Sequence, residues 1–155
     1  MGVSGCGKTS VGKALAGRLG ILYRDGDTLH PAANVAKMRA GTPLTDADRW
    51  PWLDQVGLVL AKEAPVIVAC SALKRTYRDR ICGEAKGAVT FVYLEGSRDL
   101  IAGRLAQRTG HYMPLALLDS QFAALEPPEP GEAIEVGIDQ PVTGIIEDIL
   151  RKLAL

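Results

Sequence analysis

The sequence predicts an α/β fold in which helices cover both faces of a parallel sheet. Short apolar runs alternate along the chain with segments of helical spacing, and this alternation is typical of parallel α/β folds. A glycine-rich loop directly before the first helical segment is the second indication. The chain has 155 residues, a length that suits a single domain over residues 1–155 with a core of its own.

The glycine-rich loop matches the phosphate-binding pattern G-x-x-x-x-G-K-[S/T]. Its residues are Gly2, Val3, Ser4, Gly5, Cys6, Gly7, Lys8 and Thr9. Glycines let backbone N–H groups surround phosphate oxygens, the lysine reaches the β- and γ-phosphates, and the threonine hydroxyl ligates Mg²⁺. The pattern therefore predicts ATP and Mg²⁺ as ligands, against the alternative of an ordinary turn before a helix. Such a loop should follow a strand, yet only Met1 precedes it.

Four apolar runs are the predicted strands, and they cover residues 21–24, 65–70, 89–94 and 133–138. The second run is apolar throughout, as expected of a strand covered on both faces. Predicted helices cover residues 8–19, 34–40, 48–62, 74–85, 97–108 and 142–153. In the last of these an apolar stripe repeats at helical spacing, which indicates a helix docked on the sheet.

Two signals conflict at the start of the third helix. Thr45 and Asp48 have the spacing of a capping box, but Pro51 lies too deep for a helix that begins at Thr45. We therefore expect a short first turn and a main helix that begins near Arg49, with Pro51 in its first turn.

Residues 109–131 interrupt the alternation of strands and helices. The inner part, 115–125, has helical spacing, and the outer part, 126–131, is a stiff connector that contains three prolines. Because a long excursion from a small domain is usually functional, we predict that this segment is a lid.

Composition excludes several functions. Eighteen basic residues balance eighteen acidic ones, so the chain carries no general charge for binding nucleic acid or an anionic membrane. No apolar run approaches the length of a membrane span, and we expect no signal peptide. Cys6, Cys70 and Cys82 lack the spacing of metal ligands, which suits a reducing cytoplasm. Cys6 is expected to be a small loop residue rather than a nucleophile.

Asp25 and Asp27 flank Gly26 just after the first predicted strand. Parallel α/β sheets bind ligands at the carboxyl ends of their strands, so the pair is placed for catalysis. One carboxylate would order the Mg²⁺ shell and the other would orient the accepting hydroxyl. The alternative is a simple turn, for which this sequence is well suited.

Basic residues supply further candidates. Arg49 could clamp a substrate carboxylate with two hydrogen bonds, or lie on a solvated helix face. Lys74 and Arg75 fall in the first turn of a predicted helix, where the helix dipole favours acidic residues. This local conflict indicates that they serve an anion. Trp50 and Trp52 are expected to pack rather than to form stacking platforms.

Arg104, Arg108 and His111 flank the start of the predicted lid. Arginines at the base of a lid can reach a transferred phosphoryl group as charge develops on it, and Arg108 is our catalytic candidate. Either arginine could instead be an exposed residue of the helix, and His111 is the weakest of the three.

Taken together, these segments resemble the bacterial gluconate kinases, small P-loop kinases related to shikimate and adenylate kinases. The matching segments are GVSGCGKT (2–9), DGDTLHP (25–31), NVAKM (34–38), GTPLTDADRWPWL (41–53), CSALKRTYRD (70–79), FVYLEG (91–96), GHYMP (110–114), LLDSQFAALEPP (117–128) and DQP (139–141). The second, fourth and fifth segments separate the chain from shikimate and nucleotide kinases. Cys6 departs from the serine or alanine that is usual in the family.

The resemblance implies a P-loop kinase-like three-layer sandwich with a helical lid and the strand order 2-3-1-4-5. Strand 1 precedes the loop in the family, and no sequence ahead of Met1 supplies it here. We therefore expect either a two-part sheet with a gap beside the loop, or strands closed up in an altered order. The resemblance also implies a cytoplasmic enzyme that uses ATP to phosphorylate the C6 hydroxyl of D-gluconate. A homodimer is compatible with this family.

The resemblance further assigns roles to the candidates. Residues 2–9 would hold ATP–Mg²⁺, with Lys8 stabilising the transferring phosphoryl group and Thr9 ligating the metal. Asp25 would support the water shell of the metal, and Asp27 would accept a hydrogen bond from the attacking hydroxyl. The polyol and its carboxylate would be recognised by His30, Arg49, Lys74 and Arg75. The adenine would lie between Arg104 and the turn that contains Asp139, Gln140 and Pro141.

Three alternatives stay open at this point. The chain could be a related kinase that acts on shikimate or another sugar acid. It could be a nucleotide-binding regulatory module without a substrate, although the intact aspartate pair and the lid-like segment argue against this. It could also be an inactive fragment, because the strand ahead of the loop is missing.

Overall fold

The computed structural model of the chain describes residues 1–87, 89–108 and 115–155. Its strands are β1 (Leu22–Asp25), β2 (Val66–Ala69), β3 (Phe91–Glu95) and β4 (Ala133–Gly137). Its helices are α1 (Lys8–Leu19), the 3₁₀ helix η1 (Gly26–Leu29), α2 (Ala32–Arg39), α3 (Asp46–Lys62), α4 (Arg75–Ala85), α5 (Arg98–Ala106), α6 (Leu115–Ala124) and α7 (Val142–Leu153).

The strands form two separate parallel pairs within the described residues. In the first pair, β1 lies beside β2 with Leu22 opposite Val66. In the second, β3 lies beside β4 with Phe91 opposite Ala133. The α/β class, the parallel direction and the two outer pairings of the predicted order, 2 with 3 and 4 with 5, are confirmed. The sheet is divided in two at the position where the resemblance places strand 1, as one of our two expectations stated.

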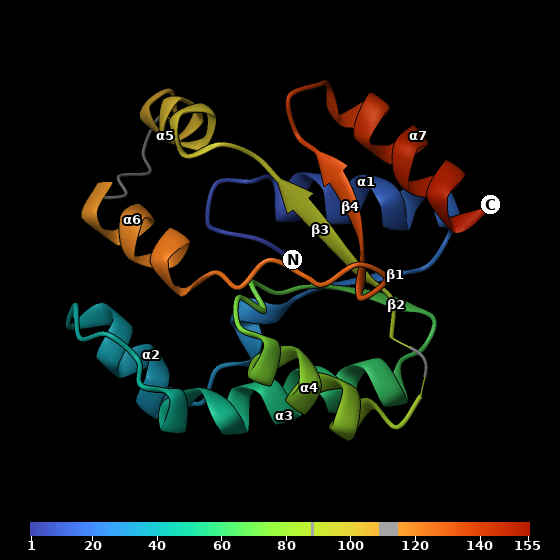
Figure 1. Cartoon of the computed structure of the whole chain (residues 1–155). Helices are drawn as coiled ribbons and strands as arrows, with labels where there is room; N and C mark the ends of the chain where they lie inside the picture. The colour runs from blue at the N-terminus through green and yellow to red at the C-terminus, as the bar shows by residue number, and fades with distance from the viewer. Residues whose placement is uncertain (88, 109–114) are drawn as a thin grey trace.

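Helices cover both sides of the strands (Figure 1). On one side, α1 and α7 pack on a core that contains the buried residues Leu15, Val136 and Ile149. On the other side, α3 and α4 pack on a second core around Leu53 and Ile81. The predicted stripe of α7 is buried over most of its length, at Ile145, Ile146, Ile149 and Leu150, whereas Val142 at its start is exposed.

The expected start of the third helix was wrong. Helix α3 begins at Asp46, and Thr45 forms a complete capping box with Asp48. Pro51 therefore lies inside the helix, where it removes one backbone hydrogen bond and crowds the carbonyl four residues earlier. The capping box and the burial of Trp52 and Leu53 offset this cost, and the proline does not end the helix.

Other boundaries differ from the sequence-based ones by at most two residues. Helix α5 ends at Ala106, where the Gln107 N–H donates to the Arg104 carbonyl and the Arg108 N–H donates to the Leu105 carbonyl. The turn after β1 forms η1, a 3₁₀ helix that the sequence analysis did not anticipate. None of the helices in the described ranges is both long and apolar enough to span a membrane.

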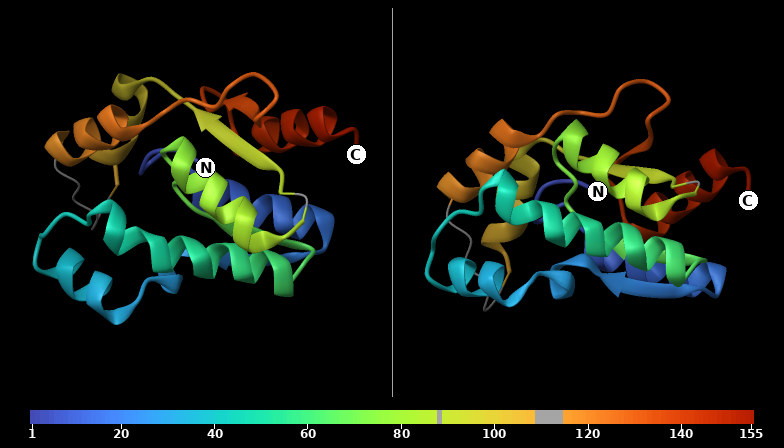
Figure 2. Two further views of the ribbon diagram at one scale, coloured as in Figure 1. Left: turned by 60° about the horizontal axis from the view of Figure 1, so that its bottom comes forward. Right: turned by 90° about the horizontal axis from the view of Figure 1, so that it is seen from below.

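Helices α2, α5 and α6 gather at one end of the molecule (Figure 2). The inner part of the predicted lid, 115–125, is helical as α6, whereas residues 109–114 lie outside the described residues. At this same end the chain leaves β1 for η1 and leaves β3 for α5. The carboxyl ends of the strands therefore face these helices.

Candidate functional site

The phosphate-binding loop has the backbone shape of an anion cradle. Gly7 caps α1 with a φ of 101°, a conformation that side chains with a Cβ rarely adopt. It offers no side chain to cap the helix, and the first turn of α1 contains no acidic residue. The N–H groups at this end are therefore left for an external anion, which the helix dipole also favours.

Lys8 lies folded over the loop that it follows. Its Nζ donates hydrogen bonds of 3.0 Å to the backbone oxygens of both Gly2 and Val3. These contacts hold the ammonium group above the curled backbone, where it can exchange carbonyl oxygens for phosphate oxygens. The loop residues present therefore fit a nucleotide phosphate, as the sequence pattern predicted.

Two helices brace the loop from outside. Gln121 on α6 accepts a hydrogen bond of 2.7 Å from the Ser4 N–H and donates one of 2.9 Å to the Ser4 hydroxyl. Leu105 on α5 lies so close to Gly5 that a Cβ there would sit 2.8 Å from the leucine Cγ. Cys6 is 1% exposed, so it fills space in the loop, as expected. Sequence analysis could not predict the Gln121 contact, because its partner Ser4 lies 117 positions away.

The aspartate pair sits at the carboxyl end of β1. The Asp25 carboxylate accepts a hydrogen bond of 3.0 Å from the Asp27 N–H, which fixes its orientation. A Cβ at Gly26 would lie 2.3 Å from the Ala69 oxygen, so only glycine allows β1 and β2 to end so close together. The Asp27 side chain is left exposed at this edge.

Electrostatic effects connect the aspartate pair with the loop. Burial raises the pKa of the Cys70 thiol to about 11, while Lys8 opposes this shift and Asp27 adds to it. Burial also raises the pKa of Tyr23, and the negative charges of Asp25 and Asp27 raise it further. The charges of Lys8 and Asp27 therefore shift the pKa of the same thiol in opposite directions.

His30 is held by the residues around it. Its ring stacks on that of Trp52 with centroids 4.1 Å apart, and Trp52 donates a hydrogen bond of 2.8 Å to the Gly26 oxygen. The Asn34 amide donates to His30 Nδ1 at 3.2 Å and to the Asp48 oxygen at 2.9 Å. A neutral His30 that accepts at Nδ1 carries its proton on Nε2, which is then free to donate. Burial lowers the pKa of His30 and so favours this neutral form.

A cationic cluster lies where α3 meets α4. Lys74 Nζ is 3.3 Å from an Asp46 carboxylate oxygen, and Arg49 Nη1 is 3.8 Å from the same oxygen. The Tyr77 hydroxyl donates to that carboxylate, and both cations lie within 6 Å of the tyrosine ring centre. The Tyr77 hydrogen bond and the Lys74 contact hold the pKa of Asp46 below its usual value. The structure thus brings Arg49 and Lys74 together, around an aspartate and a tyrosine that the sequence analysis did not single out.

Arg75 has different neighbours. Its Nε lies 3.2 Å from Asp79 and 3.6 Å from Glu132, so its charge is matched by acidic groups of this chain. The neighbouring Arg78 is 1% exposed and donates to the Ala72, Leu73 and Glu126 backbone oxygens and to Glu132. The arginines at the start of α4 therefore bind the connector 126–132 to the segment that carries Lys74.

The structure places Arg104 beside the turn predicted to contact adenine, but it gives the Gln140 side chain other partners. Arg104 donates a hydrogen bond of 2.5 Å to the Ile138 oxygen, directly before the turn at 139–141. The Gln140 side chain instead contacts the Gly137 oxygen and Asp148, and Pro141 is the N-cap of α7. Arg108 is exposed just beyond the end of α5, and His111 lies outside the described residues.

The donor set for a metal consists of few protein groups. No cluster of three or more potential metal-ligating side chains occurs in the ranges that the structure describes. Mg²⁺ is typically held by one or two protein oxygens together with phosphates and water. Thr9, exposed in the first turn of α1, and the oriented carboxylate of Asp25 fit that pattern.

Comparison with known proteins defines the family. The sequence profile of a family described as an AAA domain matches residues 1–128. A gluconokinase from Gluconobacter oxydans is 44% identical over 97% of this chain and 87% of its own length. The crystal structure of a gluconokinase from Sinorhizobium meliloti is 48% identical, with a TM-score of 0.92 over 99% of this chain and 89% of that one. A shikimate kinase from Aquifex aeolicus, 18% identical with a TM-score of 0.63 over 99% of this chain and 93% of its own, shares the fold alone. Identities of this size over most of both chains show that this chain belongs to the gluconokinase family.

Proposed function

We propose that the chain transfers the γ-phosphoryl group of ATP to the C6 hydroxyl of D-gluconate, giving 6-phospho-D-gluconate and ADP. The observation that carries this proposal is the exposed Asp27 carboxylate at the end of β1, together with the uncapped N–H groups and the Lys8 ammonium of the phosphate-binding loop. The proposal requires that a hydroxyl group bound at Asp27 faces a phosphate held in that loop.

On the nucleotide side, the uncapped N–H groups of the loop and Lys8 would bind the phosphates. Charge develops on the phosphoryl oxygens in the transition state, so a lysine at this position contributes more to turnover than to binding. Bound Mg²⁺, with Thr9 and water-linked Asp25 as its protein contacts, would neutralise phosphate charge. Arg104 lies beside the turn proposed for adenine.

On the sugar-acid side, the proposed contacts differ in chemistry. Asp27 would accept a hydrogen bond from the attacking hydroxyl and orient it, which in a loose transition state matters more than full deprotonation. His30, with its proton on Nε2, would donate to another hydroxyl. The cationic cluster formed by Arg49 and Lys74 would bind the carboxylate.

A substrate panel tests the proposal. Formation of ADP should be far faster with D-gluconate than with shikimate or nucleoside monophosphates, each with ATP and Mg²⁺. Comparable turnover of shikimate and gluconate would contradict the substrate assignment. Equal ATP turnover with and without any sugar acid would instead indicate a nucleotide-binding module that has no acceptor substrate.

We also propose that the chain acts in the cytoplasm and that the segment at about 109–131 closes over bound substrates. Helix α6, which contacts the phosphate-binding loop through Gln121, supports the second point. A homodimer is possible on the resemblance alone, and sedimentation of the purified chain tests it.

A further inference from the structure

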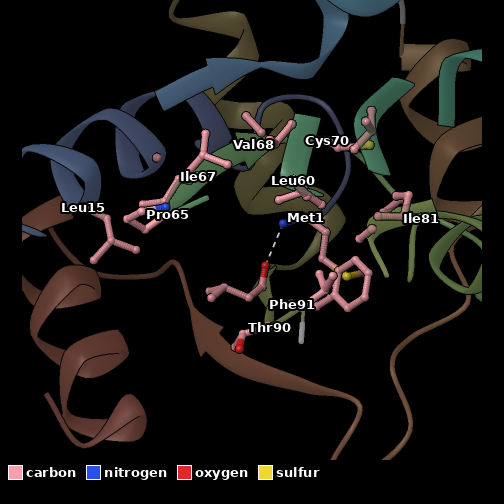
Figure 3. A pocket seen from close by; sticks show the side chains of 18 of the residues that line it. Met1, Leu15, Leu60, Pro65, Ile67, Val68, Cys70, Ile81, Thr90 and Phe91 are labelled. Atoms are coloured by element: carbon pink, nitrogen blue, oxygen red, sulfur yellow. Dashed lines mark hydrogen bonds between the residues drawn. The ribbon is translucent and has the colours of Figure 1, made fainter. Parts of the chain in front are cut away.

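Two places in this chain differ in the partners that they offer a hydroxyl group. A cavity of about 590 Å³ between β2 and β3 is lined mainly by apolar side chains, among them Leu15, Val68 and Phe91 (Figure 3). Around His30, in contrast, an aromatic ring and a buried amide contact the imidazole. Residues that position a polyol are therefore expected in the second of these places.

Asn34 on α2 is one of two buried polar side chains in the described parts of the chain, with 3% of its surface exposed. A buried amide destabilises a fold unless its hydrogen bonds are made. The Nδ2 of Asn34 has two acceptors, the Asp48 carbonyl oxygen at 2.9 Å and His30 Nδ1 at 3.2 Å. Both protons of this amide nitrogen therefore have a partner.

The Asp48 carbonyl determines which way the amide faces. A backbone oxygen can only accept, so the atom opposite it must be the nitrogen of Asn34 and not the amide oxygen. The same nitrogen faces His30 Nδ1, and because it can only donate, Nδ1 must accept. A proton on Nδ1 would place two donors against each other. The proton of a neutral His30 is therefore confined to Nε2.

Asp48 is itself fixed at the start of α3. It completes the capping box with Thr45, and its carboxylate accepts a hydrogen bond of 2.8 Å from Lys37 on α2. Helices α2 and α3 are thus joined through both the side chain and the backbone of Asp48. The amide of Asn34 cannot turn around without losing its bond to this carbonyl.

The imidazole ring is held in place as well. It stacks on Trp52 at an interplanar angle of 19°, and Trp52 Nε1 donates to the Gly26 oxygen within the turn that carries the aspartate pair. Pro31 restricts the backbone of His30 to the extended region, where its φ is −64° and its ψ is 136°. The orientation of His30 is therefore fixed relative to that turn.

We propose that Asn34 is a positioning residue of the sugar-acid site, which holds His30 as a hydrogen-bond donor at Nε2 toward a substrate hydroxyl. This inference rests on the proposed function, because it takes His30 to contact the polyol. A donor at His30 complements the acceptor at Asp27. The two side chains would therefore present opposite hydrogen-bonding roles to the substrate.

Charges around His30 act on the same proton. The charged residues on the elements packed around it are Asp27 of η1, Lys37 of α2, and Asp48 and Arg49 of α3. Burial lowers the pKa of His30, Asp27 opposes this shift and Arg49 adds to it. Lys37 and Asp48 pair with each other. Burial and the Asn34 amide thus both favour the neutral ring.

NMR of the imidazole nitrogens tests this arrangement without substrate. The chain has two histidines, so His111→Gln leaves His30 as the only imidazole to observe. In that chain the neutral ring should carry its proton on Nε2. Adding Asn34→Asp should move the proton to Nδ1, because a carboxylate only accepts, and should raise the pKa of His30 above 6.5. A proton on Nδ1 while Asn34 is present would overturn the proposal.

The pH dependence of KM for gluconate tests the effect on the substrate. With Asn34 in place, Nε2 carries a proton whether or not the ring is charged, so this KM should change by less than about twofold from pH 6 to pH 9. In N34D the charged ring still donates at pH 6, but the neutral ring at pH 9 does not. KM should then be roughly fivefold higher at pH 9 than at pH 6, with kcat within about twofold. A KM that N34D raises equally at both pH values would indicate a structural role alone and overturn the proposal.

His30→Gln is the matched control, since its amide nitrogen can donate near the Nε2 position but has no tautomers. N34D should leave the pH dependence of KM unchanged in the H30Q background. The same dependence with and without His30 would show that Asn34 does not act through the imidazole, contrary to the proposal.

Asn34→Leu replaces N34D if the carboxylate prevents folding. Without the amide donor, the pKa of His30 should rise, and an unchanged pKa would overturn the proposal. If the original chain phosphorylates no gluconate, the proposed function fails, while the NMR spectra still decide whether Asn34 fixes the proton of His30.

Discussion

The side chain of Gln121 on α6 makes two hydrogen bonds with Ser4 of the phosphate-binding loop. It accepts one of 2.7 Å from the Ser4 N–H and donates one of 2.9 Å to the Ser4 hydroxyl. The bonded N–H belongs to the loop that is proposed to bind phosphate. Helix α6 and the proposed nucleotide site are therefore joined by this polar contact, and a substitution at Gln121 should alter the binding of ATP.

Replacing Gln121 with alanine should destabilise the chain and alter ATP binding. Two partly buried hydrogen bonds contribute about 1–2 kcal/mol in total, so Tm should fall by several degrees. KM for ATP should change more than KM for gluconate, because the Ser4 N–H loses its partner. Ser120→Ala is the matched control, since the Ser120 hydroxyl bonds only within α6, to the Leu117 oxygen. Equal KM changes for ATP and gluconate in Q121A would show that the contact does not act on the nucleotide site.

Asp27→Asn separates chemistry from binding. Asparagine keeps the shape of the side chain but loses the negative acceptor, so kcat should fall at least about tenfold while ATP affinity stays within about twofold. Steady-state kinetics and a nucleotide-binding titration measure the two quantities. Asp99→Asn, at a side chain that is 94% exposed in the first turn of α5, is the control. Near-normal kcat in D27N would rule out Asp27 as the residue that orients the hydroxyl.

The cationic cluster predicts a difference between neighbouring basic residues. Lys74→Met should raise KM for gluconate roughly tenfold or more and leave KM for ATP nearly unchanged, because charged hydrogen bonds to a carboxylate are strong. Arg75→Met should raise KM for gluconate less, since Asp79 and Glu132 already match the charge of Arg75. A larger effect at Arg75 than at Lys74 would contradict this prediction and would return Arg75 to the carboxylate site that the sequence analysis assigned to it.

Local patterns explain which features the sequence could predict. The glycine loop, the apolar runs of β2 and β3, and the stripe of α7 are each encoded within a few neighbouring residues, so their elements could be placed. Asp46 and Tyr77 could not be paired in advance, because they lie 31 positions apart and meet only when α3 packs on α4. The capping box of α3 was misjudged because propensity rules count the cost of Pro51 and not the burial that offsets it.

The Met1 amine predicts a pH dependence of stability. Its pKa is about 6 in the folded chain and 8.0 when solvated, so the unfolded state binds more protons between these values. The free energy of unfolding should therefore rise from pH 6 to pH 8, by about 2–3 kcal/mol, and this contribution is lost as pH falls through 8 toward 6. Urea titrations across this range measure the slope.

A version with glycine and serine residues added ahead of Met1 is the control for that slope. Its free amine lies away from the buried position that the Met1 nitrogen occupies beside the Val92 oxygen. His30, whose pKa is also lowered by burial, adds a dependence of the same sign in both versions. The difference between the two curves therefore isolates the Met1 amine. Curves with the same slope would show that this amine does not titrate in the buried position.

Arg78 is predicted to be the most sensitive charged residue for stability. Its side chain is 1% exposed and serves three backbone oxygens together with the Glu132 carboxylate. Arg78→Met keeps much of the apolar stem but leaves these acceptors without a donor and Glu132 without its cation. Breaking a buried pair from one side costs about 3–5 kcal/mol, a large part of the stability of a typical domain.

Arg78→Lys should recover only part of that loss. An ammonium group cannot reproduce the planar guanidinium, whose nitrogens donate both to Glu132 and to the backbone oxygens. Arg80→Met is the matched control on the same helix, since Arg80 is exposed and pairs with Asp54 at the surface. Urea or thermal unfolding should show R78M far below the original chain and R80M close to it. If R78M and R80M unfold alike, the connector 126–132 is held to α4 by other contacts. The R78K variant should also show a higher KM for gluconate than the original chain. Arg78 holds the Leu73 oxygen, and Leu73 directly precedes Lys74 of the proposed carboxylate site.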